Sequence, residues 1–180
     1  MNSKLDVRGL ACAAVFTALL IASQAATAPL GNTIITGSLV NAILAITAVV
    51  CAARYSIAVA VVSPFLAMLF GIGPARWELI PFIALGNAVL VLAWYFVTRH
   101  KSYNLVRFMI AAAIAAVLKF VVLYVGVTKI AVPFILALPA PAAATISAMF
   151  SVPQLITASI GGAIAVVASP LILRAKKAGE

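Results

Sequence analysis

The chain has 180 residues, of which 66% are hydrophobic and 8% are charged, and its mean hydropathy is +1.26. Soluble globular domains carry about 25% charged residues, and a domain of this size cannot bury such an apolar excess in one core. The composition therefore excludes a soluble enzyme, a disordered tail and a disulfide-stapled secreted module. The net charge is +9, but the basic residues are scattered between apolar runs. We expect them to orient membrane spans and to contact lipid headgroups rather than to bind nucleic acid.

Six apolar segments are long enough to cross the hydrocarbon core of a bilayer, which takes about 20 helical residues. Breaks that contain Pro, Gly, Asn or basic residues separate them. We therefore predict a single all-α integral membrane domain over residues 1–180, a six-transmembrane-helix bundle. The predicted spans are Leu10–Ala28, Ile35–Ala53, Ser56–Ile72, Leu79–Val97, Leu105–Val127 and Ala148–Leu173.

The first predicted span carries a stripe of alanines on one side. Ala14, Ala18 and Ala22 recur every fourth residue, which places them on one face of a helix. In lipid, such small-residue stripes let helix backbones approach closely. The stripe therefore either packs inside the bundle or docks on another membrane protein.

The two cysteines of the chain lie near the cytoplasmic ends of the first two predicted spans. A reducing compartment and burial in the membrane disfavour a disulfide between Cys12 and Cys51, and two cysteines alone do not form a metal site. We predict that both are small apolar packing residues.

Lys119 is the most informative polar residue, because it lies in the middle of the fifth predicted span. It follows Arg107 by twelve residues, or about 18 Å along a helix, which places the amine in the outer half of the bilayer. Ionisable groups at such depth are costly and usually functional. Two interpretations stay open: Lys119 snorkels or pairs with Glu78, or it faces an anionic group of a substrate.

Other polar residues lie at a similar depth. Asn87 is eight residues, or about 12 Å, inside the fourth span, Asn41 lies about two turns inside the second, and Gln154 follows Pro153 in the sixth. An interhelical hydrogen bond would explain any one of them, but their convergence near Lys119 predicts a binding pocket that opens outward. Further candidates border this face: Trp77, which also fits an interfacial position, Glu78, and Asn32 in the first outer loop.

The stretch between the fifth and sixth spans contains Pro133, Pro139 and Pro141. It is too short and too rich in proline for a seventh span, so we expect a long ordered loop or a re-entrant segment that packs on protein or lines a cavity.

The basic residues predict the orientation of the bundle. Nine fall on one side and two, Arg76 and Lys129, on the other, which places both termini in the cytoplasm of a cell-membrane protein. A signal peptide cleaved after Ala26–Ala28, leaving five spans, is the alternative for the first segment. The nine basic residues on the predicted cytoplasmic side are Lys4, Arg8, Arg54, Arg99, Lys101, Arg107, Arg174, Lys176 and Lys177.

The chain offers few groups for catalysis. It has three carboxylates, of which Asp6 and Glu180 lie in the terminal tails, and one histidine, His100, in a basic loop. Acid–base and metal-assisted catalysis need several convergent titratable groups, and no ATP-binding motif occurs. We therefore expect a binding protein rather than an enzyme, with no metal and no cofactor.

These features together resemble the substrate-binding S component of an energy-coupling factor (ECF) transporter. The resemblance covers essentially the whole chain: about 180 residues, six spans, a basic N-terminus and the alanine-striped first helix. The short segments that carry it are Ala14–Ala22, Thr36–Ala42, Ile83–Ala88, Leu118–Phe120, Pro153–Leu155 and Ile160–Gly162.

The resemblance implies a prokaryotic importer subunit for a vitamin or related micronutrient, which works with a transmembrane T component and two cytoplasmic ATPase subunits. It implies that the stripe of Ala14, Ala18 and Ala22 docks on the T component and that Asn32 lies in a lid loop. A carboxylate- or phosphate-bearing substrate would suit Lys119. The rival functions are a self-sufficient secondary carrier or channel, and an assembly subunit of a membrane complex.

Overall fold

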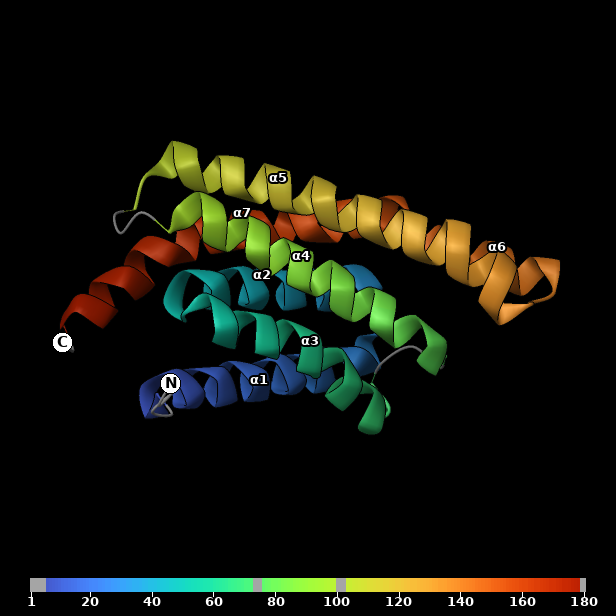
Figure 1. The fold of residues 1–180 in the computed structure, drawn as a ribbon, viewed down its shortest axis with the longest axis horizontal. Helices are drawn as coiled ribbons and strands as arrows, with labels where there is room; N and C mark the ends of the chain where they lie inside the picture. The colour runs from blue at the N-terminus through green and yellow to red at the C-terminus, as the bar shows by residue number, and fades with distance from the viewer. Residues whose placement is uncertain (1–5, 73–75, 100–102, 179–180) are drawn as a thin grey trace, which may run out of the picture.

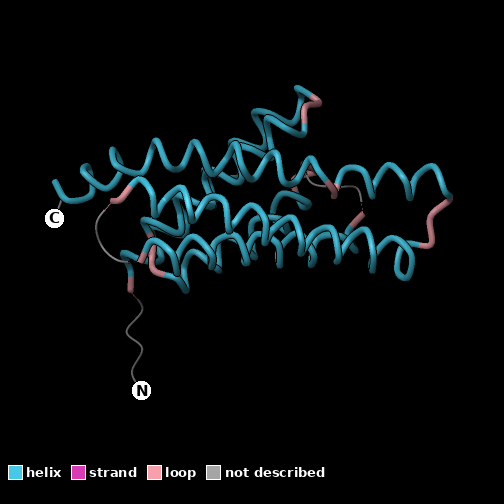
Figure 2. The backbone as a smooth tube through the Cα atoms, turned by 90° about the horizontal axis from the view of Figure 1, so that it is seen from above, coloured by secondary structure: helices cyan, strands magenta, loops and turns pink. Residues whose placement is uncertain are grey.

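The computed structural model describes residues 6–72, 76–99 and 103–178, and these residues form helices and connecting loops without a strand (Figures 1 and 2). The all-α class is thus confirmed. The α-helices are α1 (Val7–Thr27), α2 (Thr33–Val50), α3 (Ala53–Leu69), α4 (Ile80–Thr98), α5 (Leu105–Leu123), α6 (Ala140–Met149) and α7 (Val152–Ala178). Two short 3-10 helices, η1 (Ala28–Leu30) and η2 (Trp77–Leu79), and the π-helix η3 (Tyr124–Leu136) complete the order.

Five helical stretches in the described part of the chain are long and apolar enough to cross a membrane, which indicates a multi-pass membrane protein. The remaining candidate, α3, has 17 residues and is slightly shorter than the others. The long stretches are Val7–Leu30, Thr33–Val50, Trp77–Thr98, Leu105–Leu136 and Ala140–Ala175.

The helices run side by side along the long axis, with α2, α4, α5 and α7 packed together and α1 and α3 on one side of this group (Figure 1). Trp94 of α4 and Phe108 of α5 are buried and meet edge to face, with ring centroids 6.0 Å apart. Small side chains let the helices approach closely elsewhere. At Gly161 of α7, an added Cβ would lie 2.6 Å from the Cβ of Asn41 on α2.

Local caps define where α2 and α5 begin. The Asn32 side chain accepts hydrogen bonds from the backbone amides of Ile34 (3.0 Å) and Ile35 (3.3 Å), and Asn104 accepts one from Arg107 (3.0 Å). These bonds satisfy amides that have no partner within the first turn of a helix. Gly31, at φ +61°, makes the turn between η1 and α2 in the left-handed conformation that glycine tolerates.

The proline-rich stretch is helical, so the expectation of a long ordered loop there is wrong, and the alternative of a re-entrant segment stays a prediction. The π-helix η3 continues α5 directly, and α6 turns back beside it (Figure 1). Pro133 lies inside η3 and, because it has no N–H, leaves one backbone hydrogen bond of this helix unmade. Pro141 lies in the first turn of α6, where its missing N–H costs little.

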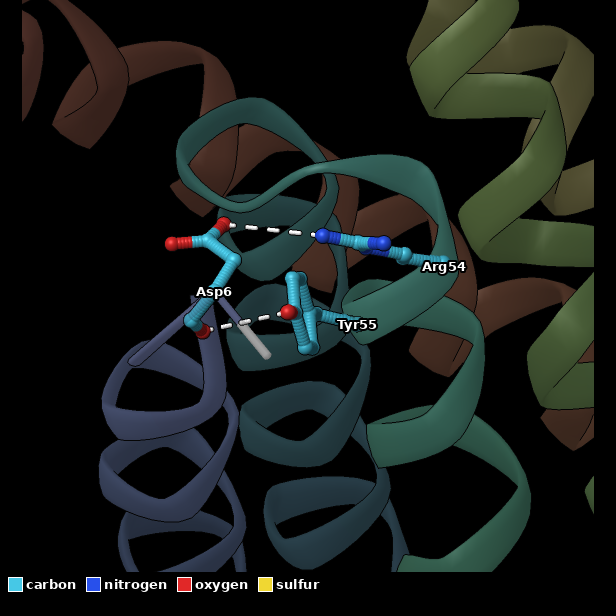
Figure 3. A network of polar contacts seen from close by, with 3 residues as sticks. All are labelled: Asp6, Arg54 and Tyr55. Carbon is cyan, nitrogen blue, oxygen red and sulfur yellow. Dashed lines mark hydrogen bonds and ion pairs between the residues drawn. The ribbon is translucent and has the colours of Figure 1, made fainter. Parts of the chain in front are cut away.

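The N-terminal end of α1 is tied to the start of α3 (Figure 3). The Asp6 carboxylate lies 3.8 Å from the Arg54 guanidinium, and the Tyr55 hydroxyl donates to the Asp6 carbonyl at 3.1 Å. The guanidinium also stacks over the Tyr55 ring, 4.7 Å from its centroid. These three residues form a polar clasp.

Below this clasp the structure pairs Cys12 of α1 with Cys51, the residue that follows α2, in a disulfide. The prediction of two unpaired packing residues is therefore wrong. The packing of α1 against α2 and α3 brings the two Cα atoms to 6.3 Å, within the range that a disulfide bridges. Whether the two cysteines meet depends on the register between the helices, and the sequence pattern does not show this register.

Candidate functional site

A cavity of about 320 Å³ lies at the end of the bundle opposite the clasp. It is enclosed by the last turns of α1 and α3, by η1, and by residues of α2, α4, α5 and α7. Its volume is at the small end of the range of about 300–1,000 Å³ that is usual for ligand pockets. The polar side chains in its lining are Gln24, Asn32, Thr33, Thr36, Asn41, Ser63, Asn87, Lys119 and Gln154.

The structure brings together five of the residues that the sequence singled out. Lys119, Asn41 and Asn87 lie at the buried floor of the cavity, with exposed fractions of 4%, 2% and 3%. Asn32 and Gln154 also line the cavity and are more accessible. The predicted convergence of polar groups from separate spans is thus present as a geometric fact.

The Lys119 amine is held by two amide oxygens. Its Nζ donates to Asn41 Oδ1 at 2.6 Å and to Asn87 Oδ1 at 2.7 Å, so three helices, α2, α4 and α5, meet at one nitrogen. Both distances are shorter than the usual 2.9–3.0 Å of a neutral N–H···O bond and resemble those of charge-assisted bonds. An ammonium has three N–H donors, and these two bonds use two of them.

A second layer fixes one of the two amides. Asn41 Nδ2 donates to the Thr157 hydroxyl of α7 at 3.3 Å, and that hydroxyl donates to the Gln154 carbonyl at 3.2 Å. Asn87 has no such support: within the described chain its Nδ2 makes no hydrogen bond. The two asparagines therefore differ, because Asn41 is anchored on both sides and the Asn87 amide nitrogen is available.

The rim of the cavity also has unused hydrogen-bonding capacity. Gln24 Nε2 donates to the Leu20 carbonyl (3.3 Å) and Gln154 Nε2 to the Met149 carbonyl (3.2 Å). Their oxygens, which can accept, make no hydrogen bond within the described chain. The rim can therefore accept hydrogen bonds while the floor donates them.

Trp77 and Glu78 do not join this group. Trp77 is 65% exposed on η2, and neither residue lines the cavity. No ion pair links Glu78 to Lys119 among the described residues, whose one ion pair joins Arg54 and Asp6. One Glu78 oxygen is buried without a hydrogen-bond partner. The interpretation of Lys119 as the partner of Glu78 is therefore wrong.

Sequence reasoning missed several lining residues, chiefly Gln24, Thr36 and Ser63. Gln24 lies one turn from the outer end of the first predicted span, at a depth comparable to Gln154. The depth argument, applied to every polar residue of every span, would have included it. Thr157 was missed although it lies one turn after Gln154, on the same side of the helix.

The alanine stripe of α1 faces away from the bundle. Ala14, Ala18 and Ala22 are all exposed, while Leu20 on another side of the helix is fully buried. The interpretation of the stripe as internal packing is therefore wrong. The exposed face is free to contact lipid or another membrane protein.

The comparisons with family models, curated proteins and solved structures found no match to this chain. A function must therefore be inferred from the residues and their geometry.

Proposed function

We propose that the chain is the substrate-binding S subunit of an ECF-type importer, which captures a vitamin-like micronutrient in the cavity around Lys119 and delivers it inward with a T component and two ATPase subunits. The observation that carries the proposal is the small, polar-floored cavity inside an apolar helix bundle. Buried polar groups in a membrane protein are costly and mark binding sites and transport pathways, and the chain has no motif for ATP hydrolysis.

The proposal includes six spans with both termini in the cytoplasm. At 1.5 Å per residue, α3 is about 26 Å long, and a small local thinning of the bilayer lets such a helix span it. The start of α1 and the end of α7 lie at one end of the molecule, and η1, η2 and η3 lie toward the other (Figures 1 and 2). The cavity is at the second end, so this topology opens it to the outside.

The proposal assigns the exposed alanine stripe of α1 to the T component. Three small side chains on one exposed face permit a close helix–helix approach. Close packing against lipid needs no such stripe, because acyl chains adapt to any apolar surface.

Small molecules released from the purified protein test the proposal. We expect one compound in roughly stoichiometric amount from the wild type and at least about tenfold less from Lys119→Ala, since hydrogen bonds to a charged group contribute about 1.5–3 kcal/mol. Mass spectrometry of the denatured sample measures both amounts. Lys129→Ala, which removes an exposed lysine on η3, is the matched control and should retain the compound.

Three results would count against this function. Equal amounts of the compound from Lys119→Ala, with unchanged circular dichroism, would place binding elsewhere. Uptake by the chain alone in liposomes without ATP would favour a secondary carrier. No carboxylate lines the described cavity, and proton-coupled carriers usually need an intramembrane carboxylate. A membrane-complex assembly subunit would release no compound at all.

A further inference from the structure

We propose that the ligand of this cavity is a compact monocarboxylate, bound with its carboxylate at the floor between Lys119 and Asn87, and not a phosphate ester or a neutral amide. This inference rests on the proposed binding function and names the substrate class. It follows from the number of donors at the floor, from the charge of the lining and from the size of the cavity.

Hydrogen-bond donors at the floor of the cavity remain free, because no acceptor for them lies within the described chain. Lys119 Nζ uses two of three N–H groups on the amides of Asn41 and Asn87. The Nδ2 of Asn87, with two more N–H groups, has no partner within the described residues. Both side chains line the cavity. One carboxylate, which offers two oxygens and no donor, can accept from both at once.

The charge of the lining indicates a single negative charge on the ligand. Lys119 is the one basic residue in the described lining, and no Asp or Glu accompanies it. Asp6 is paired with Arg54 at the far end, and Glu78 lies outside the cavity. A buried ammonium needs a counter-charge. A monoanion supplies it in full, whereas a phosphate ester with two charges would leave a buried negative charge unpaired.

The two asparagines have different roles in this arrangement. Asn41 is a positioning residue, because one of its two amide N–H groups donates to Thr157 and its oxygen holds the amine. Asn87 both holds the amine and presents its free amide nitrogen to the ligand. The cavity volume of about 320 Å³, at the small end of the usual range for ligand pockets, suits a compact molecule.

Three small probes with the same ring test the inference: benzoate, benzamide and phenyl phosphate, titrated up to tens of millimolar against the purified protein in detergent. We expect benzoate to raise the midpoint of thermal unfolding of the wild type with an apparent Kd about tenfold or more below that of the other two. In Lys119→Met the preference for benzoate should disappear.

Asn87→Asp is the second variant, and it keeps the test informative if Lys119→Met does not fold. It places a carboxylate 2.7 Å from the amine, at the position of the present amide oxygen. This carboxylate supplies the counter-charge of the Lys119 amine, so the variant should fold. Because the amine is then already paired, benzoate should raise the midpoint of thermal unfolding much less. Lys129→Met, at an exposed position of η3 outside the cavity lining, is the control that should retain the preference for benzoate.

Several results would overturn the inference: equal effects of the three probes, a preference for phenyl phosphate, no effect of benzoate, or a benzoate preference that survives in Asn87→Asp. The mass of the compound released from the purified protein gives an independent readout. In acidic methanol each carboxyl group becomes a methyl ester, so a monocarboxylate gains one methyl group. A released compound without a carboxyl group would overturn the carboxylate assignment and leave the binding function intact. A benzoate preference without any released compound would support the carboxylate site and count against the importer subunit.

Discussion

Lys119 lies at a depth where an isolated charge would be strongly unfavourable, yet three helices are arranged around it. The amides of Asn41 and Asn87 replace two of the water molecules that an exposed ammonium would hold. Amide oxygens carry only partial negative charge, so they solvate the ammonium without neutralising it. The site therefore stays electropositive, which an Asp or Glu in place of either asparagine would prevent.

The position of Asn41 depends on a glycine on the facing helix. A Cβ at Gly161 would lie 2.6 Å from the Asn41 Cβ and 2.6 Å from the Ser38 carbonyl oxygen. Gly161→Ala should therefore separate α2 from α7 and lower stability by about 1–3 kcal/mol, as overpacking does, and weaken ligand binding as well. Thermal unfolding and compound release measure the two effects. Ala163→Val, at an exposed position of α7, should change stability by no more than about 0.5 kcal/mol; equal effects of the two variants would refute this role for Gly161.

The depth of each polar residue could be predicted from the sequence, because a helix advances about 1.5 Å per residue and the span ends are marked by charges. That depth correctly brought Asn41, Asn87, Lys119 and Gln154 together. Which side chains face each other could not be predicted, because the rotation of each helix about its axis is set by packing. For that reason the pairing of Lys119 with two asparagines appeared only in the structure.

Among the five long apolar stretches of the described chain, the one that begins with α1 is the least buried. At one end the clasp and the Cys12–Cys51 disulfide hold it to the α2–α3 connection, and at the other end Gln24 reaches the cavity. Between these ends its alanine stripe is exposed. The helix thus links the ligand site to an open membrane-facing surface.

The disulfide should contribute measurably to the attachment of α1. It closes a loop with a sequence separation of 39, and disulfides typically stabilise by about 2–4 kcal/mol. Reduction of the wild type should lower the unfolding midpoint toward that of a Cys12→Ser/Cys51→Ser double variant, which should not respond to reductant. A maleimide-coupled polymer reacts only with free thiols. If it labels the unreduced, denatured wild type and shifts its band on a gel, the two cysteines do not form a disulfide.

The alanine stripe predicts a separation of binding from transport. Ala18→Trp places a large ring on the exposed face of α1, so it should abolish uptake by cells that carry the complete transporter and leave ligand binding to the isolated subunit unchanged. Val117→Trp adds the same ring at an exposed position of α5 and should spare uptake. Normal uptake by Ala18→Trp would argue against the docking role.

The bounds of the first five α-helices could be predicted to within a few residues, because apolar length is a strong signal. The η3–α6 region could not, because Pro133 and Pro141 normally indicate loops. A first helical turn tolerates proline and the π-helix η3 contains one, but apolar periodicity reveals neither feature. The disulfide escaped prediction because it depends on the register of α1 against α2.

At the scale of the whole molecule, charge is distributed unevenly between the two ends. In the described chain, basic residues occupy the start of α1, the first turn of α3, the end of α4, the first turn of α5 and the end of α7, whereas the cavity end has Arg76, Lys129 and, in the cavity itself, Lys119. This bias predicts that the clasp end is cytoplasmic. The disulfide beside the clasp favours the opposite side, because cytosolic thiols are kept reduced. The two signals disagree about one and the same end.

Accessibility of single cysteines resolves this disagreement. In the Cys12→Ser/Cys51→Ser background, Lys129→Cys on η3 and Arg99→Cys after α4 place one thiol at an exposed position of each end. With the cavity end outside, a membrane-impermeant maleimide should label position 129 in intact cells and position 99 only after permeabilisation. We expect this pattern, because many basic residues must cross the membrane in the reverse orientation and one disulfide can form after lysis. The reverse pattern would place the clasp and its disulfide outside and open the cavity to the cytoplasm, so that an importer that captures its ligand outside would be excluded.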